Sequence, residues 1–264
     1  MYSFDYQRPA NAAAAAAAFQ GDARYLAGGQ SLVQAMRLRL SSSERLVDLG
    51  GASELRGIRV DGNNVVIGAM TTHASVAASA EVRQAIPALA ELAGGIGDPM
   101  VRNMGTLGGS IANADPAADY PAAVLALGAT VQTNKRTIPG DSFFTGLYET
   151  ALQPGELITG VSFPKAAKAA YVKYKQPASR FALVGVFVAQ TAGGVRVAVT
   201  GAKGSVYREK ALEDALSKGF TPEAAKAVKM SASGMNADLH GSAAYRAAMI
   251  SVMAARAVAA ATAR

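Results

Sequence analysis

Cysteine is absent from this 264-residue sequence, and its absence excludes several classes of site. A chain without thiols forms no disulfide, holds no cysteine-ligated iron–sulfur cluster or zinc ribbon, and has no thiol nucleophile. The only histidines are His73 and His240, so we do not expect a metal site either. Tryptophan is also absent and aromatic residues make up 6% of the chain, so the core must consist largely of aliphatic side chains.

Long runs of charged residues are absent too. The net charge is +7, but the lysines and arginines are scattered, and no basic run exceeds the pair Lys135-Arg136. Nucleic-acid sites cluster their basic residues on one face and often interleave them with aromatic residues. The charge therefore favours contact with acidic partner proteins or with solvent, and we expect no nucleic-acid partner.

No uninterrupted apolar run is long enough to span a membrane. Residues 12–18 are apolar but too few, and the alanine-rich stretch 242–261 is interrupted by Arg246 and Arg256. Residues 1–6 lack the charged start and apolar core of a signal peptide. We expect a soluble, cytoplasmic protein with no membrane span.

What the sequence does contain is glycine, concentrated in two polar segments. Residues 105–110 hold three glycines, with hydroxyl groups at Thr106 and Ser110, and residues 26–32 have the same character about 80 positions earlier. Glycine lets a backbone approach a ligand closely, and exposed N–H groups bind phosphate without a lysine or a metal. The spacing matches neither the Walker loop nor the Rossmann fingerprint. The segments are predicted to hold one diphosphate from two sides, with simple turns as the alternative.

Charged side chains near these segments are weaker signals. Asp115 precedes a proline and is most simply the cap of a helix over residues 116–127. Asp119, in the first turn of that helix, either contacts a ligand hydroxyl or stays in solvent and favours the helix dipole. Three further candidates have simple structural explanations. His73 would lie at the start of a helix, Lys175 on the surface of a strand, and Phe181 in the core.

Hydrophobic periodicity and turn signals predict an α+β chain. Residues 1–52 form a small strand–helix–strand lobe, and hairpins are expected around Asp61-Gly62 and Asn134-Lys135. Helices are expected at 81–93, with a break at Pro87, and at 143–151. Composition changes near residues 165–168. Beyond this point we expect an antiparallel sheet with helices on one face, from strands 171–175, 181–191 and 195–201 and helices 210–217, 222–229 and 242–261.

Taken together, several segments resemble the flavoprotein (medium) subunit of the molybdenum hydroxylases. This is the xanthine dehydrogenase family, which includes aerobic carbon monoxide dehydrogenase. The likeness covers nearly the whole chain, and the segments are specific in combination although each alone is not. They are residues 27–32, 67–73, 102–110, 115–121, 155–158 and 174–181.

The resemblance implies a two-part fold with FAD as the cofactor. Residues 1–165 would form an FAD-binding domain of the vanillyl-alcohol-oxidase (PCMH) type, with subdomains at about 1–52 and 53–165. Residues 166–264 would form a small α+β C-terminal domain with a three-stranded antiparallel sheet. The cofactor-binding residues that it implies are Tyr25, Leu26, Ala27, Gly28, Gly29, Gln30, Ser31, Leu32, Ile96, Thr106, Leu107, Gly108, Gly109, Ser110, Asp119, Ile158, Lys175 and Phe181.

The implied function is electron transfer within a molybdenum hydroxylase complex. The subunit takes electrons from iron–sulfur clusters and passes them to an external acceptor, with no catalytic acid or base of its own. Because the chain has no cysteine, the clusters belong to a small two-iron–two-sulfur subunit, beside a large molybdenum-cofactor subunit in a heterotrimer. Two alternatives stay open, a non-catalytic flavin-fold scaffold subunit and a stand-alone flavin-dependent reductase. Carbon monoxide, an aldehyde, a purine and other N-heterocycles stay open as the substrate of the complex.

Overall fold

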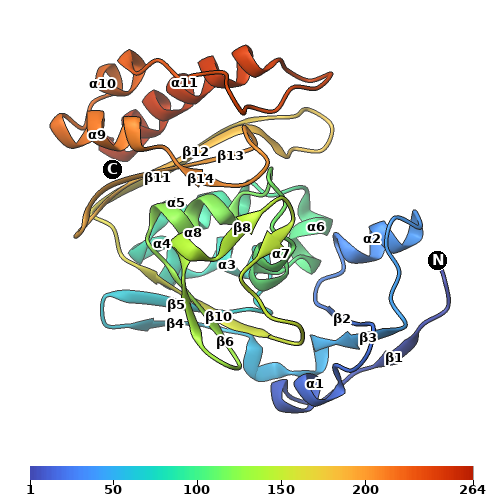
Figure 1. The fold of residues 1–264 in the computed structure, drawn as a ribbon. Helices are drawn as coiled ribbons and strands as arrows, with labels where there is room; N and C mark the ends of the chain where they lie inside the picture. The colour runs from blue at the N-terminus through green and yellow to red at the C-terminus, as the bar shows by residue number, and fades with distance from the viewer. Residues whose placement is uncertain (264) are drawn as a thin grey trace.

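Three larger sheets organise the fold, and Figure 1 shows them following one another from the N-terminal strands to the C-terminal strands and helices. The computed structural model describes residues 1–263 of the 264. The first sheet is parallel, with strand order β1-β3-β2, and confirms the predicted strand–helix–strand pattern. Its elements are β1 (Asp5–Gln7), α1 (Ala12–Ala18), β2 (Ala23–Leu26), α2 (Leu32–Arg37) and β3 (Arg45–Asp48), followed by the short 3₁₀ turns η1 (Leu49–Gly51) and η2 (Ser53–Leu55).

The second sheet is antiparallel, with strand order β4-β5-β10-β6-β7. Both predicted hairpins are confirmed in it. Gly62 turns the first hairpin with a φ of +56°, a conformation that glycine adopts without steric cost. The strands are β4 (Ile58–Asp61), β5 (Asn64–Gly68), β6 (Thr130–Thr133), β7 (Thr137–Pro139) and β10 (Ile158–Pro164).

Six short helices connect β5 to β6 and supply much of the largest apolar core. The predicted break at Pro87 is confirmed, because one helix ends before it and the next begins at the proline. The helices are α3 (His73–Ala78), α4 (Ala80–Ala85), α5 (Pro87–Gly94), α6 (Pro99–Met104), α7 (Leu107–Asn113) and α8 (Tyr120–Ala126).

The prediction of a helix at residues 143–151 is wrong. This stretch follows a 3₁₀ turn, η3 (Gly140–Ser142), and forms a two-stranded hairpin of β8 (Phe144–Gly146) and β9 (Glu149–Thr150). Tyr148 turns it with a φ of +55°, which the interior of a right-handed helix does not accommodate. The local backbone geometry therefore overrides the apolar spacing.

The third sheet has four antiparallel strands in the order β11-β12-β13-β14, so the three-stranded prediction is corrected while the α+β class is confirmed. The added strand is only two residues long, which is too short to leave a periodic pattern. The elements are β11 (Lys168–Lys175), β12 (Ala182–Thr191), β13 (Gly194–Thr200), β14 (Tyr207–Arg208), α9 (Lys210–Lys218), α10 (Pro222–Ala227) and α11 (Ala243–Thr262).

Helices cover both faces of the third sheet, not one face as expected. Figure 1 shows α9, α10 and α11 on one side and α5 and α8 of the central region on the other. Burial on both faces explains why Ala182–Ala189 is a continuous apolar run with every residue buried. The C-terminal strands are thus packed directly against the part of the chain that carries the glycine segments.

Helix α11 is the one described helix that is long and apolar enough to cross a membrane by length and composition. It packs along β11 and β12 and buries a stripe that includes Ile250, Met253, Ala257 and Ala261. Spacings of three and four residues put these side chains on one face. The helix therefore serves the core of the third sheet.

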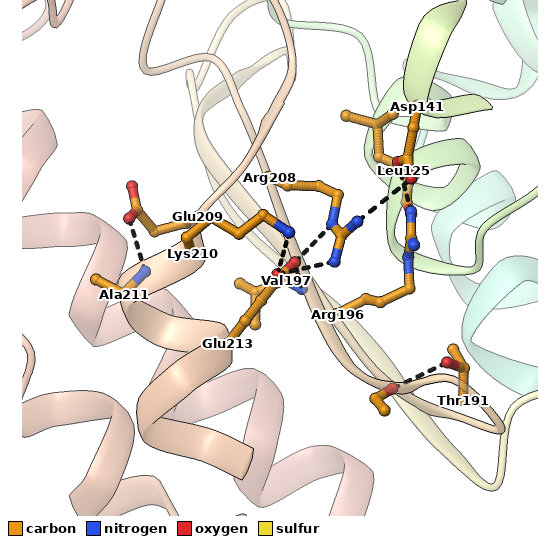
Figure 2. Close-up of polar contacts among 11 residues, drawn as sticks. Leu125, Asp141, Thr191, Arg196, Val197, Arg208, Glu209, Lys210, Ala211 and Glu213 are labelled. Carbon is orange, nitrogen blue, oxygen red and sulfur yellow. Dashed lines mark hydrogen bonds and ion pairs between the residues drawn. The ribbon is translucent and has the colours of Figure 1, made fainter. Parts of the chain in front are cut away.

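A network of ion pairs ties the third sheet to the central region (Figure 2). Asp141, in η3, binds Arg196 of β13 at 2.5 Å and Arg208 of β14 at 3.3 Å. Arg208 also forms two hydrogen bonds with the buried Glu213 of α9, at 2.7 and 2.8 Å. Lys210 and the backbone N–H of Val197 donate to the same carboxylate, which therefore joins a helix to two strands.

We expect Glu213→Gln to lower the free energy of unfolding by about 2–3 kcal/mol, because the guanidinium of Arg208 loses a charged partner in a partly buried place. Urea denaturation would measure the change. Glu209→Gln is the matched control, since Glu209 only caps α9 by accepting from the N–H of Ala211, and a change within about 0.5 kcal/mol is expected. Equal effects of the two substitutions would contradict the assigned role of Glu213.

Candidate functional site

A cavity of about 410 Å³ lies where the three sheets and their connections meet. Its walls come from the β2–α2 connection, from residues 96–119, from residues 152–158 and from residues 179–181 of the β11–β12 connection. The size falls within the range of small-molecule and cofactor sites. Segments that are distant in the sequence therefore line the same cavity.

The β2–α2 connection contributes backbone donors to this cavity. The N–H groups of residues 28–32 have no hydrogen-bond acceptor within residues 1–263. Gly29 has a φ of +71°, so the connection depends on glycine at that position. A run of successive unpaired N–H groups is the usual construction of an anion-binding concavity. This connection therefore has the chemistry predicted for it.

The two glycine segments touch one another. A Cβ on Gly28 would lie 1.9 Å from the carbonyl oxygen of Met104 and 2.8 Å from the Cα of Gly105. A Cβ on Gly109 would lie 3.4 Å from the Cβ of Ala27. Glycine at position 28 thus allows the backbones to pack directly, and both segments face the same cavity.

The second segment is a helix start, not the open loop that the sequence suggested. Residues 107–113 are helical, and Thr106 caps them by accepting from the N–H of Gly109 at 3.1 Å. The N–H of Leu107 donates to Thr71 and that of Gly108 to Ala69, so these N–H groups are already paired. The side-chain donors of this segment at the cavity are the hydroxyl groups of Thr106 and Ser110 and the amide of Asn113.

Asp115 does not cap a helix. It sits in a turn, where its Oδ1 accepts from the N–H of Ala117 at 2.8 Å and its Oδ2 from the hydroxyl of Tyr148 at 3.2 Å. The following helix begins at Tyr120, later than predicted, because residues 116–118 are bound to the third sheet. Thr200 donates its hydroxyl to this stretch, and the N–H of Gly201 donates to Pro116 at 2.7 Å.

Asp119 is buried, which rules out the solvent-exposed carboxylate considered for it. Its Oδ2 pairs with the Lys173 ammonium at 2.8 Å and its Oδ1 accepts from the Tyr171 hydroxyl at 2.5 Å. The pKa of Asp119 is raised, because the effect of burial is larger than the lowering effects of Lys173 and Tyr171. Burial also raises the pKa of Tyr171 well above its usual value, so its hydroxyl stays protonated and donates.

Glu156 fixes the turn that brings Ile158 to the cavity. Its buried carboxylate accepts two hydrogen bonds from Arg136, at 2.9 and 3.0 Å, and one from the Thr133 hydroxyl at 2.8 Å. These bonds, those from Arg136 above all, lower the pKa of Glu156 to about 2. The carboxylate therefore remains ionised and holds this wall in place.

The β11–β12 connection forms the remaining edge. Arg180 has a φ of +62°, and its guanidinium donates to the carbonyl oxygen of Gly97 at 3.3 Å. Arg102 donates to the same carbonyl and to that of Ile96. Phe181 is 46% exposed and lines the cavity, so its interpretation as a core residue is wrong.

Nearly all the residues implied by the resemblance surround the cavity; those that do not line it are Leu26, Leu107 and Lys175. Lys175 lies at the exposed end of β11, whereas Lys173, two positions earlier, reaches Asp119. Sequence reasoning missed Lys173 and Tyr171. The strand period was the available signal, because residues 171, 173 and 175 share one face of β11.

Comparison with known proteins identifies the family. Residues 2–166 match the model described as "FAD binding domain in molybdopterin dehydrogenase". The chain belongs to this family. It is 38% identical to the carbon monoxide dehydrogenase medium chain of Hydrogenophaga pseudoflava over 99% of this chain and 98% of that protein.

A further relative and a solved structure show the same likeness. The nicotine 6-hydroxylase medium subunit of Paenarthrobacter nicotinovorans is 34% identical over 92% of this chain and 91% of its own length. A solved structure of carbon monoxide dehydrogenase from Hydrogenophaga pseudoflava superposes with a TM-score of 0.89 at 39% identity, covering 98% of this chain and 97% of that one. The family is named for FAD, and the donor set of the cavity fits such a dinucleotide: unpaired N–H groups and hydroxyls suit its diphosphate, and apolar walls suit its ring.

We expect Lys173→Met to destabilise the protein by about 3 kcal/mol or more, because Asp119 then keeps a buried charge without its ammonium partner. Urea denaturation of the full chain would measure this. Lys175→Met is the matched control on the same strand, and a change within about 0.5 kcal/mol is expected because Lys175 is exposed. A similar loss in both variants would show that the ion pair is not the cause.

Proposed function

We propose that this chain is the FAD-binding electron-transfer subunit of a molybdenum hydroxylase complex. The observation that carries the proposal is the run of unpaired N–H groups at residues 28–32, packed against the start of α7 on one cavity. When bound, FAD supplies a carrier that stores two electrons between one-electron donors and an acceptor. The work of the chain is to bind, orient and shield that carrier.

Each wall has a separate binding task in this proposal. Residues 25–32 hold the diphosphate through backbone N–H groups, and Thr106 to Ser110 add hydroxyls from the opposite side. Asp119, held by Lys173 and Tyr171, offers carboxylate oxygens to cofactor hydroxyls. Apolar contact with the ring system would come from Ile96, Ile158 and Phe181, which line the cavity, and the resemblance adds Lys175, which does not line it.

The domain layout and the partners belong to the same proposal. Residues 1–165 are a PCMH-type FAD domain in two subdomains, and residues 166–264 are a separate C-terminal domain. Within residues 1–263 no group of three metal-ligating side chains exists, and the whole chain lacks cysteine. In this proposal the metal centres that donate electrons to FAD therefore lie in other chains. These are a small two-iron–two-sulfur subunit and a large molybdenum subunit. The complex is cytoplasmic and delivers its electrons to an external acceptor.

The names of the relatives point to different substrates, carbon monoxide for one and nicotine for another. In this proposal, substrate oxidation occurs on the large subunit, so the FAD subunit does not specify it. A scaffold subunit without flavin is the first alternative, and the unpaired donors at residues 28–32 argue against it. A stand-alone flavin reductase is the second, and NADPH oxidation by the isolated chain would support it.

Gly109→Val is expected to weaken FAD binding at least about tenfold, because its side chain enters the contact between Ala27 and Thr106. Fluorescence titration of the FAD-free chain would measure the dissociation constant, with circular dichroism to confirm folding. Gly204→Val is the control, since nothing lies within 4 Å of its Cβ position. A wild-type chain that stays colourless after incubation with FAD would refute the cofactor assignment.

Purification of the tagged chain from its native host tests the assignment to a complex. We expect it to co-elute with a molybdenum-containing chain and an iron–sulfur chain, with FAD in equal amount to the tagged chain. Gel filtration with elemental analysis would measure this. Elution of the chain alone, without molybdenum, would refute the electron-transfer role and favour the reductase alternative.

A further inference from the structure

His73 stands in the wall of the cavity, although its sequence context suggested only a structural role. Two backbone hydrogen bonds join its segment to the second glycine segment, from the N–H of His73 to Gly105 at 3.0 Å and from that of Leu107 to Thr71 at 3.1 Å. Thr72 caps the helix that begins at His73. These bonds fix the imidazole beside the start of α7.

The imidazole ring is packed on two sides. A Cβ on Gly105 would lie 2.6 Å from Nε2 of His73, so the ring rests directly on a glycine. The centroid of the Tyr120 ring lies 5.3 Å away on another side. His73 is 5% exposed and still contributes to the cavity surface. Its orientation is therefore set by packing.

Neither ring nitrogen of His73 has a hydrogen-bond partner within residues 1–263. Nδ1 is fully enclosed, whereas Nε2 is not among the enclosed unpartnered atoms and so keeps some accessible surface. Buried polar groups in folded proteins are almost always paired, so an unpaired one in a cavity wall calls for a partner from outside the chain, such as water or a ligand. His73 is one of the residues that line the cavity.

The imidazole is neutral at neutral pH. Burial, followed by the nearby charge of Arg102, lowers the pKa of His73 to about 4. A neutral imidazole carries one N–H and one lone pair. An enclosed N–H without an acceptor is less tolerable than an enclosed lone pair. The proton therefore belongs on Nε2, the nitrogen that keeps accessible surface.

We propose that His73 is a further cofactor-contacting residue, which donates a hydrogen bond from Nε2 to an acceptor oxygen or nitrogen of FAD. This inference rests on the proposed function. It adds a neutral donor to the wall formed by Ala69, Met70 and Thr106. No charge or proton transfer is required of it, so its contribution is to binding and to the orientation of the cofactor.

Three substitutions separate a donor from a merely structural side chain. The amide nitrogen of His73→Gln falls near the position of Nε2, that of His73→Asn falls near Nδ1, and His73→Phe keeps ring packing against Tyr120 without any donor. We expect the Gln variant to bind FAD within about threefold of the wild type. The Asn and Phe variants are expected to bind roughly tenfold more weakly, which is the effect of one lost hydrogen bond.

Fluorescence titration of FAD into the full-length apo chain would give the four dissociation constants. Phe binding as tightly as wild type, or Gln binding as weakly as Phe, would overturn the donor role while the FAD assignment stands. A wild-type chain that does not bind FAD would overturn both proposals. If the variants fail to fold, ¹⁵N NMR of the wild-type imidazole replaces them: we expect protonated Nε2 and a change in its shift on adding FAD, and an unchanged shift would refute the contact.

Discussion

The contact between Gly28 and the backbone at Met104 and Gly105 is the constraint on which the site depends. It brings the parallel N-terminal sheet against the helices of the central region with no side chain between them. A methyl group at this place would overlap a carbonyl oxygen, and the two segments would have to separate. This approach holds residues 28–32 beside the segment that carries Thr106 and Ser110, and both segments line the cavity.

A second constraint comes from the third sheet. Asp119 forms a buried ion pair with Lys173, and the Thr200 hydroxyl binds the turn before Asp119. Together with the pairing of Asp141 with Arg196 and Arg208, these contacts hold β11 to β14 against the central region. Because β11 leads into the connection that carries Arg180 and Phe181, the same contacts place the last wall of the cavity.

The sequence predicted what local chemistry determines. The hairpin at Gly62, the break at Pro87 and the pairing of two glycine segments all follow from backbone preferences or from a family resemblance. The sequence did not predict features of the structure that depend on contacts between residues far apart in the chain. The late start of α8 depends on bonds from Thr200 and Gly201, which lie some 80 residues away and leave no trace near residue 116. The ion pair of Asp119 with Lys173, 54 residues later, likewise depends on how β11 is placed in the third sheet.

The distribution of unpaired donors argues that the cavity is built around a ligand. The N–H groups at the start of α7 are paired within the protein, while those of residues 28–32 and the imidazole of His73 are not. Of these groups only Nδ1 of His73 is fully enclosed, whereas residues 28–32 are partly or fully exposed. A ligand with acceptor oxygens would take these donors in place of water. The neutral state of His73 fits the same logic, since a neutral donor is cheaper to bury than a cation.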